Sequence, residues 1–112
     1  MQAPAVAQLE SALDRLVRML AEWGAVKIIL FGSVARGDYS GASDIDLIVV
    51  KETDARLPQR IAEALDYCAR AGTPLPVEPL VYTPAEFARM VTEENPLITE
   101  ALRHGRVLYD AT

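Results

Sequence analysis

Two carboxylates one residue apart are the side chains of this sequence best suited to chemistry. Asp44 and Asp46 flank Ile45 at the start of an apolar run that ends at Val50. Because alternate residues of a strand point to one face, the pair shares a face of a predicted strand over 44–50. Like charges repel there, and Mg²⁺ relieves the repulsion because it prefers hard oxygen ligands. The alternative is an ordinary strand end, where one Asp caps a turn and the other is exposed.

A glycine-serine pair lies ten residues before the carboxylates. Gly32 directly follows the apolar run 27–31, where a glycine permits a sharp turn or a close approach to a ligand. Ser33, at the start of a short helical turn over 33–36, offers a hydroxyl and backbone N–H groups to phosphate oxygens. Strand, Gly-Ser, ten residues, Asp-x-Asp and strand together indicate a site for a phosphorylated ligand and a metal ion.

The elements that must position these residues follow from periodicity, caps and turn residues. Apolar residues at helical spacing predict a helix over 4–23, and Pro58, Pro84 and Pro96 each fit the first turn of a later helix. The expected class is α/β, a small mixed β-sheet packed with helices, in a single domain over 1–112. The predicted elements are a helix 4–23, a strand 27–31, a strand 44–50, a helix from Pro58 to Gly72, a strand 77–82, a helix after Thr83, a short helix from Asn95 to Gly105 and a strand 107–109.

Composition excludes several classes of function. The 112 residues carry a net charge of −5, and the basic residues are scattered among acids, so most of them are expected on solvated faces. This pattern argues against a general nucleic-acid binder. No apolar run approaches the roughly 20 residues that span a bilayer, and the acidic N-terminal stretch is unlike a signal peptide. We therefore expect no membrane association and a cytoplasmic location. Cys68 is a lone cysteine on an apolar helix face, so it is expected in the core rather than in a disulfide.

The chemical residues belong to a longer pattern. Phe31-Gly32-Ser33-Val34-Ala35-Arg36-Gly37, followed by Ser43-Asp44-Ile45-Asp46-Leu47, resembles the signature of the DNA polymerase β-like nucleotidyltransferases. The sequence is most similar to their smallest branch, the minimal nucleotidyltransferases, also in its Thr-Pro-x-Glu-Phe stretch at 83–87 and its Gly-x-Val-Leu-Tyr stretch at 105–109. The resemblance implies the nucleotidyltransferase fold. It also implies that Gly32 and Ser33 hold the triphosphate of ATP, and that Asp44 and Asp46 bind two Mg²⁺ ions.

Two further residues are candidates for this site. The resemblance implies a third carboxylate on the next strand, which binds metal and helps to deprotonate the nucleophile. Glu78 is the candidate, although the family more often has Asp there. A carboxylate within an apolar strand is costly to bury, and Pro79 favours an edge or a bulge, so Glu78 is either a metal ligand or an exposed edge residue. Arg36 is a candidate for contacting the triphosphate, with a solvated loop position as the alternative.

The resemblance also implies a partner protein. Many members of the branch act with a small all-helical protein of the HEPN type, as an antitoxin that transfers AMP from ATP to a tyrosine of that partner. This is the leading hypothesis. The alternatives are a non-catalytic binding module that neutralises or scaffolds a helical partner, and a small-molecule nucleotidyltransferase completed by a second subunit. The sequence leaves the nucleotide, the acceptor and the homo- or hetero-oligomeric state open.

Overall fold

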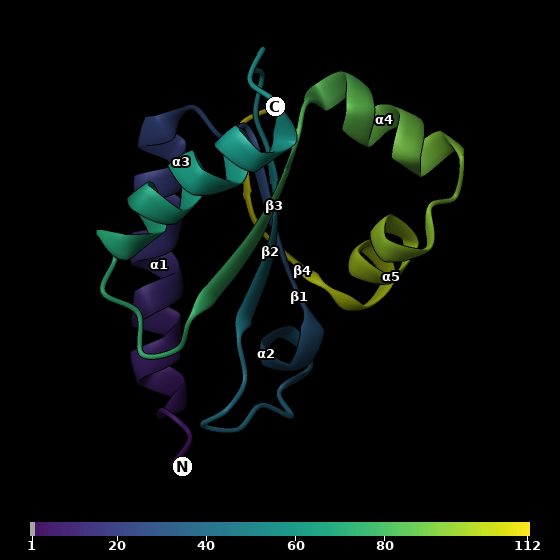
Figure 1. The fold of residues 1–112 in the computed structure, drawn as a ribbon. Coiled ribbons are helices and arrows are strands. Elements are labelled where there is room, and N and C mark those ends of the chain that lie inside the picture. The colour runs from purple at the N-terminus through teal and green to yellow at the C-terminus, as the bar shows by residue number, and fades with distance from the viewer. Residues whose placement is uncertain (1) are drawn as a thin grey trace.

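Helices cover both faces of a four-stranded sheet in the computed structural model, which describes residues 2–112 (Figure 1). The predicted order of elements is confirmed, with shifts of a few residues at their ends. The first helix begins two residues later than predicted, and Asp44 lies just before its strand rather than within it. The elements are α1 Val6–Trp23, β1 Lys27–Phe31, α2 Gly32–Arg36, β2 Ile45–Val50, α3 Leu57–Ala69, β3 Val77–Tyr82, α4 Pro84–Thr92, α5 Pro96–His104 and β4 Arg106–Asp110.

The sheet is mixed, as its predicted class requires. Its strand order is β3-β2-β1-β4, with β1 antiparallel to both β2 and β4 and with β2 parallel to β3. The parallel pair is joined by α3, because parallel neighbours need a crossover connection. The strand order makes β3 an edge strand, which is one of the two positions predicted from Pro79. An edge strand tolerates proline because no ladder on its open side needs the N–H that proline lacks.

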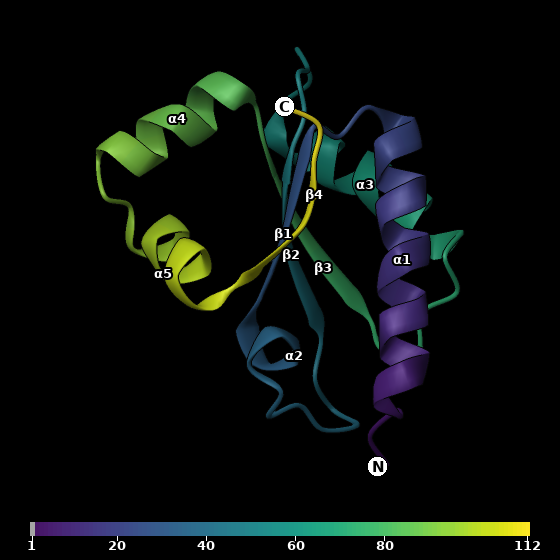
Figure 2. The ribbon, with the colours of Figure 1, turned by 180° about the vertical axis from the view of Figure 1, so that it is seen from behind.

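Alternation along the strands separates two apolar faces. Ile28, Leu30, Leu47 and Val49 are fully buried on the face that α1 and α3 cover. Ile29 and Ile48 point the other way and pack against Ile98 and Ala101 of α5. Figure 2 shows α1 and α3 on one side of the sheet, and α4 and α5 on the other. Since Asp46 is two residues before Ile48 on β2, its side chain belongs to the face of α4 and α5.

The helices begin and end at the capping and turn residues that the sequence indicates. Gly24 adopts a φ of 114° at the end of α1, a conformation that favours glycine. Thr83 and Glu86 form the reciprocal capping box at the start of α4, and the Asn95 side chain accepts two backbone N–H bonds at the start of α5. His104 lies in the last turn of α5, where a histidine interacts favourably with the helix dipole.

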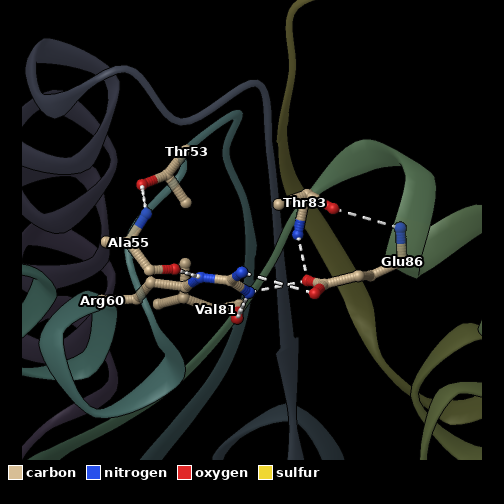
Figure 3. A network of polar contacts seen from close by, with 6 residues as sticks. All are labelled: Thr53, Ala55, Arg60, Val81, Thr83 and Glu86. Carbon is tan, nitrogen blue, oxygen red and sulfur yellow. Dashed lines mark hydrogen bonds and ion pairs between the residues drawn. The ribbon is translucent and has the colours of Figure 1, made fainter.

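Arg60 departs from the general expectation that the arginines are solvated. It is buried, and its guanidinium donates to the backbone oxygen of Ala55 at 2.7 Å and to the carboxylate of Glu86 at 2.7 and 3.3 Å (Figure 3). A longer bond of 3.4 Å reaches the backbone oxygen of Val81 on β3. Arg60 therefore ties together α3, β3 and α4, which periodicity alone does not reveal.

The Arg60–Glu86 pair predicts a pH-dependent stability. The hydrogen bond from Arg60, followed by that from the Thr83 backbone N–H, lowers the pKa of Glu86 below its usual 4.5. The ionised carboxylate thus stabilises the fold above that pH, and this contribution is lost as pH falls through the folded-state pKa. Since the Glu86 side chain is 44% exposed, we expect Glu86→Gln to lower the free energy of unfolding at pH 7 by only about 1–2 kcal/mol.

Urea unfolding at several pH values measures this effect. The difference between wild type and Glu86→Gln should shrink as pH falls below about 4.5, because the wild-type carboxylate is then protonated. Glu93→Gln removes the same charge from an exposed position at the end of α4 and serves as the control. A gap for Glu86→Gln that stays constant down to acidic pH contradicts the interpretation.

Candidate functional site

The Gly-Ser pair and the Asp-x-Asp pair meet at one end of the sheet. β1 ends at Phe31, α2 begins at Gly32, and Phe31 lies opposite Asp46 in the antiparallel register of β1 and β2. The connection from α2 through residues 37–44 turns the chain back, so that residues more than ten positions apart become neighbours. Figure 1 shows α2 at this end of the sheet, away from α4.

Gly32 lies against the Asp46 carboxylate. Its φ is 76°, a backbone conformation that side chains rarely tolerate. A Cβ atom at this position would overlap Oδ2 of Asp46 and lie 3.3 Å from its Cγ. Glycine is therefore required twice, for the turn from β1 into α2 and for the close approach of this backbone to the carboxylate.

Asp46 is the electrostatic centre of the site. Burial raises the pKa of its carboxyl above the usual range, and the charges of Asp44 and Glu78 raise that pKa further. The positive charge of Arg36 acts in the opposite direction. Each of the three other predicted charged residues is thus close enough to Asp46 to act on its ionisation, and the acidic ones disfavour its charged form.

Glu78 faces Asp46 across the parallel pair of strands. The two residues are register partners in β2 and β3, so their side chains leave the same face of the sheet. Glu78 is exposed on this edge strand, so the burial cost that the sequence raised for it does not arise. The position is that of an exposed edge residue, which also leaves the carboxylate free to turn toward a ligand.

The carboxylates of Asp44, Asp46 and Glu78 lie at one end of the sheet but do not form a group of metal ligands. Among residues 2–112, no three Asp, Glu, His or Cys side chains are gathered closely enough to hold a metal ion. Asp44, Asp46 and Glu78 do not form such a group here, and their role as metal ligands stays a prediction. The donor set itself, three carboxylates on one side of a sheet end, fits the hard oxygen ligands that Mg²⁺ takes.

Ser33 and Arg36 occupy the two ends of α2. Ser33 is half-buried in the first turn, and its carbonyl accepts the backbone N–H groups of Gly37 at 3.0 Å and Asp38 at 3.2 Å. Arg36 is the last residue of α2 and is exposed, with its Nε 3.3 Å from a carboxylate oxygen of Asp38. The Arg36 guanidinium is accessible, and its positive charge acts to lower the pKa of Asp46.

A hollow beside α2 is not indicated by the sequence motifs, although residues 34–37 of the first motif line part of it. It has a volume of about 300 Å³ and lies between α1 and α2, with Leu9 and Leu13 on one wall, Val34 and Arg36 on the other. The bidentate ion pair between Glu10 and Arg106 closes part of its rim at 2.8 and 2.6 Å. Its lining comes from four separate segments, so no local pattern could indicate it.

Other residues weighed in the sequence have structural roles. Cys68 is buried, which confirms the predicted core position. Burial raises the pKa of its thiol to about 11, so Cys68 is a poor nucleophile.

Within the described part of the chain, no helix is both long and apolar enough to cross a bilayer.

The sequence model of a family described as "Nucleotidyltransferase domain" matches residues 10–107 of the chain. Over 28 residues, 25% of this chain, the sequence is 64% identical to a protein of Methanocaldococcus jannaschii named "putative protein adenylyltransferase". The match spans only 28% of the relative's length.

The arrangement of the elements has also been seen before. A solved structure described as a toxin-antitoxin with AMP-PNP superposes with a TM-score of 0.65 over 88% of this chain and 73% of that chain. The two sequences are 19% identical, so the likeness concerns the fold. It confirms the predicted α/β arrangement of a mixed sheet and its helices.

Proposed function

The chain belongs to the nucleotidyltransferase domain family, and on that premise we propose that it transfers AMP from ATP to a hydroxyl of a small helical protein of the HEPN type. In this role it is the antitoxin of a toxin-antitoxin pair. The observation that carries the transfer is the placement of Gly32 and α2 against Asp46, with Glu78 opposite. The protein acceptor is supported by the name of the archaeal relative and by the toxin-antitoxin structure of like fold.

In this proposal, the residues at the Asp46 end of the sheet have two roles, phosphate binding and metal binding. The backbone at Gly32 and the hydroxyl of Ser33 would hold phosphate oxygens, with the exposed Arg36 guanidinium as a further phosphate contact. Asp44, Asp46 and Glu78 would hold two Mg²⁺ ions, and these ions supply charge neutralisation at the phosphates when bound. For Glu78 this requires the exposed side chain to turn toward Asp46.

The reaction balances without a further reagent. The acceptor oxygen forms a bond to the α-phosphorus of ATP, the bond from that phosphorus to pyrophosphate breaks, and pyrophosphate leaves. The hydroxyl proton passes to a carboxylate or to water; in this proposal Glu78, the exposed carboxylate opposite Asp46, takes it. The acceptor then carries AMP.

A second candidate is a binding module that neutralises its helical partner by contact alone. Glu78 favours it, because this residue stands where the family more often has Asp, and Mg²⁺ tolerates misplaced ligands poorly. The two candidates differ in whether the partner gains mass during incubation with ATP and Mg²⁺.

Metal-dependent ATP binding tests the site without any partner. Three carboxylates repel a triphosphate, so we expect calorimetry to show ATP binding with Mg²⁺ and little binding in chelator. Ser33→Ala should weaken the Mg²⁺-dependent binding by roughly fivefold, since one hydrogen bond contributes about 1 kcal/mol. Ser11→Ala removes an exposed serine hydroxyl from α1 and is the control. Equal affinity for ATP in chelator and in Mg²⁺ would exclude the proposed site.

A further inference from the structure

A groove between the start of α3 and one side of α4 lies outside the candidate active site. We call it the α3–α4 groove; it has a volume of about 470 Å³ and includes Leu57, Tyr82 and Met90 among its apolar residues and Arg56 and Arg89 among its charged ones. A volume of this size accommodates a large side chain with its neighbours. The groove meets the sheet at Tyr82, the last residue of β3.

Residues on one face of α4 line one side of the α3–α4 groove. Glu86, Arg89, Met90 and Glu93 all line the groove, and their separations of three and four residues place them on one face of α4. The groove thus runs along about 10 Å of the helix, from its capped first turn to its end. The Arg60–Glu86 pair holds α3 and α4 in place at one end of the groove, so this shape is built into the fold.

The apolar part of the groove is left open. Leu57 is 43% exposed although it begins α3, and Tyr82 and Met90 are half-buried. An aromatic residue, a methionine and a leucine around one hollow form a surface of the composition that anchors partner side chains.

The α3–α4 groove carries a net positive charge, although the whole chain is acidic. Arg60 and Glu86 neutralise each other, whereas the exposed Arg56 and Arg89 have no carboxylate within ion-pair distance among residues 2–112. Glu93 is also present, so the groove retains an excess of positive charge on a chain whose net charge is −5. Such a local excess selects for carboxylates near an apolar anchor.

We infer that the α3–α4 groove docks an acidic segment of another protein, with one apolar side chain of that segment between Leu57, Tyr82 and Met90. Carboxylates of the segment pair with Arg56 and Arg89. Tyr82 is four residues along β3 from Glu78, which corresponds to roughly 13 Å. The docked segment therefore lies apart from the Asp46 end of the sheet. The inference concerns binding alone and does not depend on nucleotidyl transfer.

Two synthetic peptides test the chemistry of the groove. One carries a leucine and a phenylalanine flanked by glutamates, and the other carries the same apolar residues flanked by lysines. Titration of the ¹⁵N-labelled full chain is expected to shift amide signals of Leu57, Tyr82 and Met90 with the glutamate peptide. Despite the acidic chain, this peptide should bind at least about fivefold tighter than the lysine peptide.

Variants with equal net charge locate the effect. Arg56→Gln with Arg89→Gln should remove the preference for the glutamate peptide, while Arg18→Gln with Arg103→Gln, at exposed positions on α1 and α5, should retain it. ATP binding should be unchanged in both double variants, which separates this inference from the proposed function. A preference for the lysine peptide, signal shifts elsewhere, or concentration-dependent self-association through the groove in the absence of peptide would each overturn it.

Discussion

Replacing Asp44 and Asp46 together by asparagine is expected to lower nucleotidyl transfer by at least about 10³-fold, because the reacting phosphoryl group loses the carboxylates proposed to hold its metal ions. The fold should persist, and the melting temperature should equal or exceed that of the wild type. Asparagine keeps nearly the same volume. The variant removes the Asp46 carboxyl, whose pKa is raised by burial and by the charges of Asp44 and Glu78, and it removes the Asp44 charge as well. The measurement is the intact mass of a helical partner after incubation with ATP and Mg²⁺, with a melting curve alongside.

A matched double variant separates the site from a general loss of charge. Asp54→Asn with Asp66→Asn makes the same chemical change at two exposed positions, one before α3 and one within it, and should leave transfer unaffected. If wild type and the Asp44/Asp46 variant bind the partner equally and neither adds a nucleotide to it, the enzyme is excluded and the binding module is supported. If only the wild type adds AMP, the binding-only function is excluded.

Gly32→Ala is expected to damage both stability and nucleotide binding. A φ of 76° costs a non-glycine residue about 1–2 kcal/mol, which should appear as a lower free energy of unfolding. The added methyl group also overlaps the Asp46 carboxylate, so the carboxylate must move from its position beside α2. We expect Mg²⁺-dependent ATP affinity to fall at least about tenfold, since a displacement costing 1.4 kcal/mol suffices for that change.

Gly37→Ala supplies the control for this prediction. Gly37 has a similar φ of 83° at the other end of α2, but an added Cβ atom there would meet nothing within 4 Å. Both alanine variants should therefore lose comparable stability in urea unfolding, while calorimetry should show a large loss of ATP affinity in Gly32→Ala alone. Equal losses of affinity would mean that Gly32 contributes through backbone conformation, without its close approach to Asp46.

The sequence alone carries much of the local structure. Gly24, Thr83 and Asn95 mark helix ends correctly because caps depend on residues a few positions apart. The strands were predicted for the same reason, since alternation and apolar runs are local patterns. The Gly32-Ser33 and Asp44-Ile45-Asp46 motifs were recognisable because their spacing is short and their chemistry is unusual.

The relations between distant segments came from the fold. Strand order makes Glu78 the neighbour of Asp46, and its exposure on an edge removes the burial cost that the sequence had raised. Arg60 looked like a solvated helix residue, yet α4 and β3 close over it and give it three acceptor atoms, while the Ala55 backbone oxygen before α3 gives it a fourth. The α3–α4 groove likewise combines residues from three elements. These features depend on packing between residues tens of positions apart. Such contacts produce no periodic pattern in the sequence of either segment, so local patterns do not predict them.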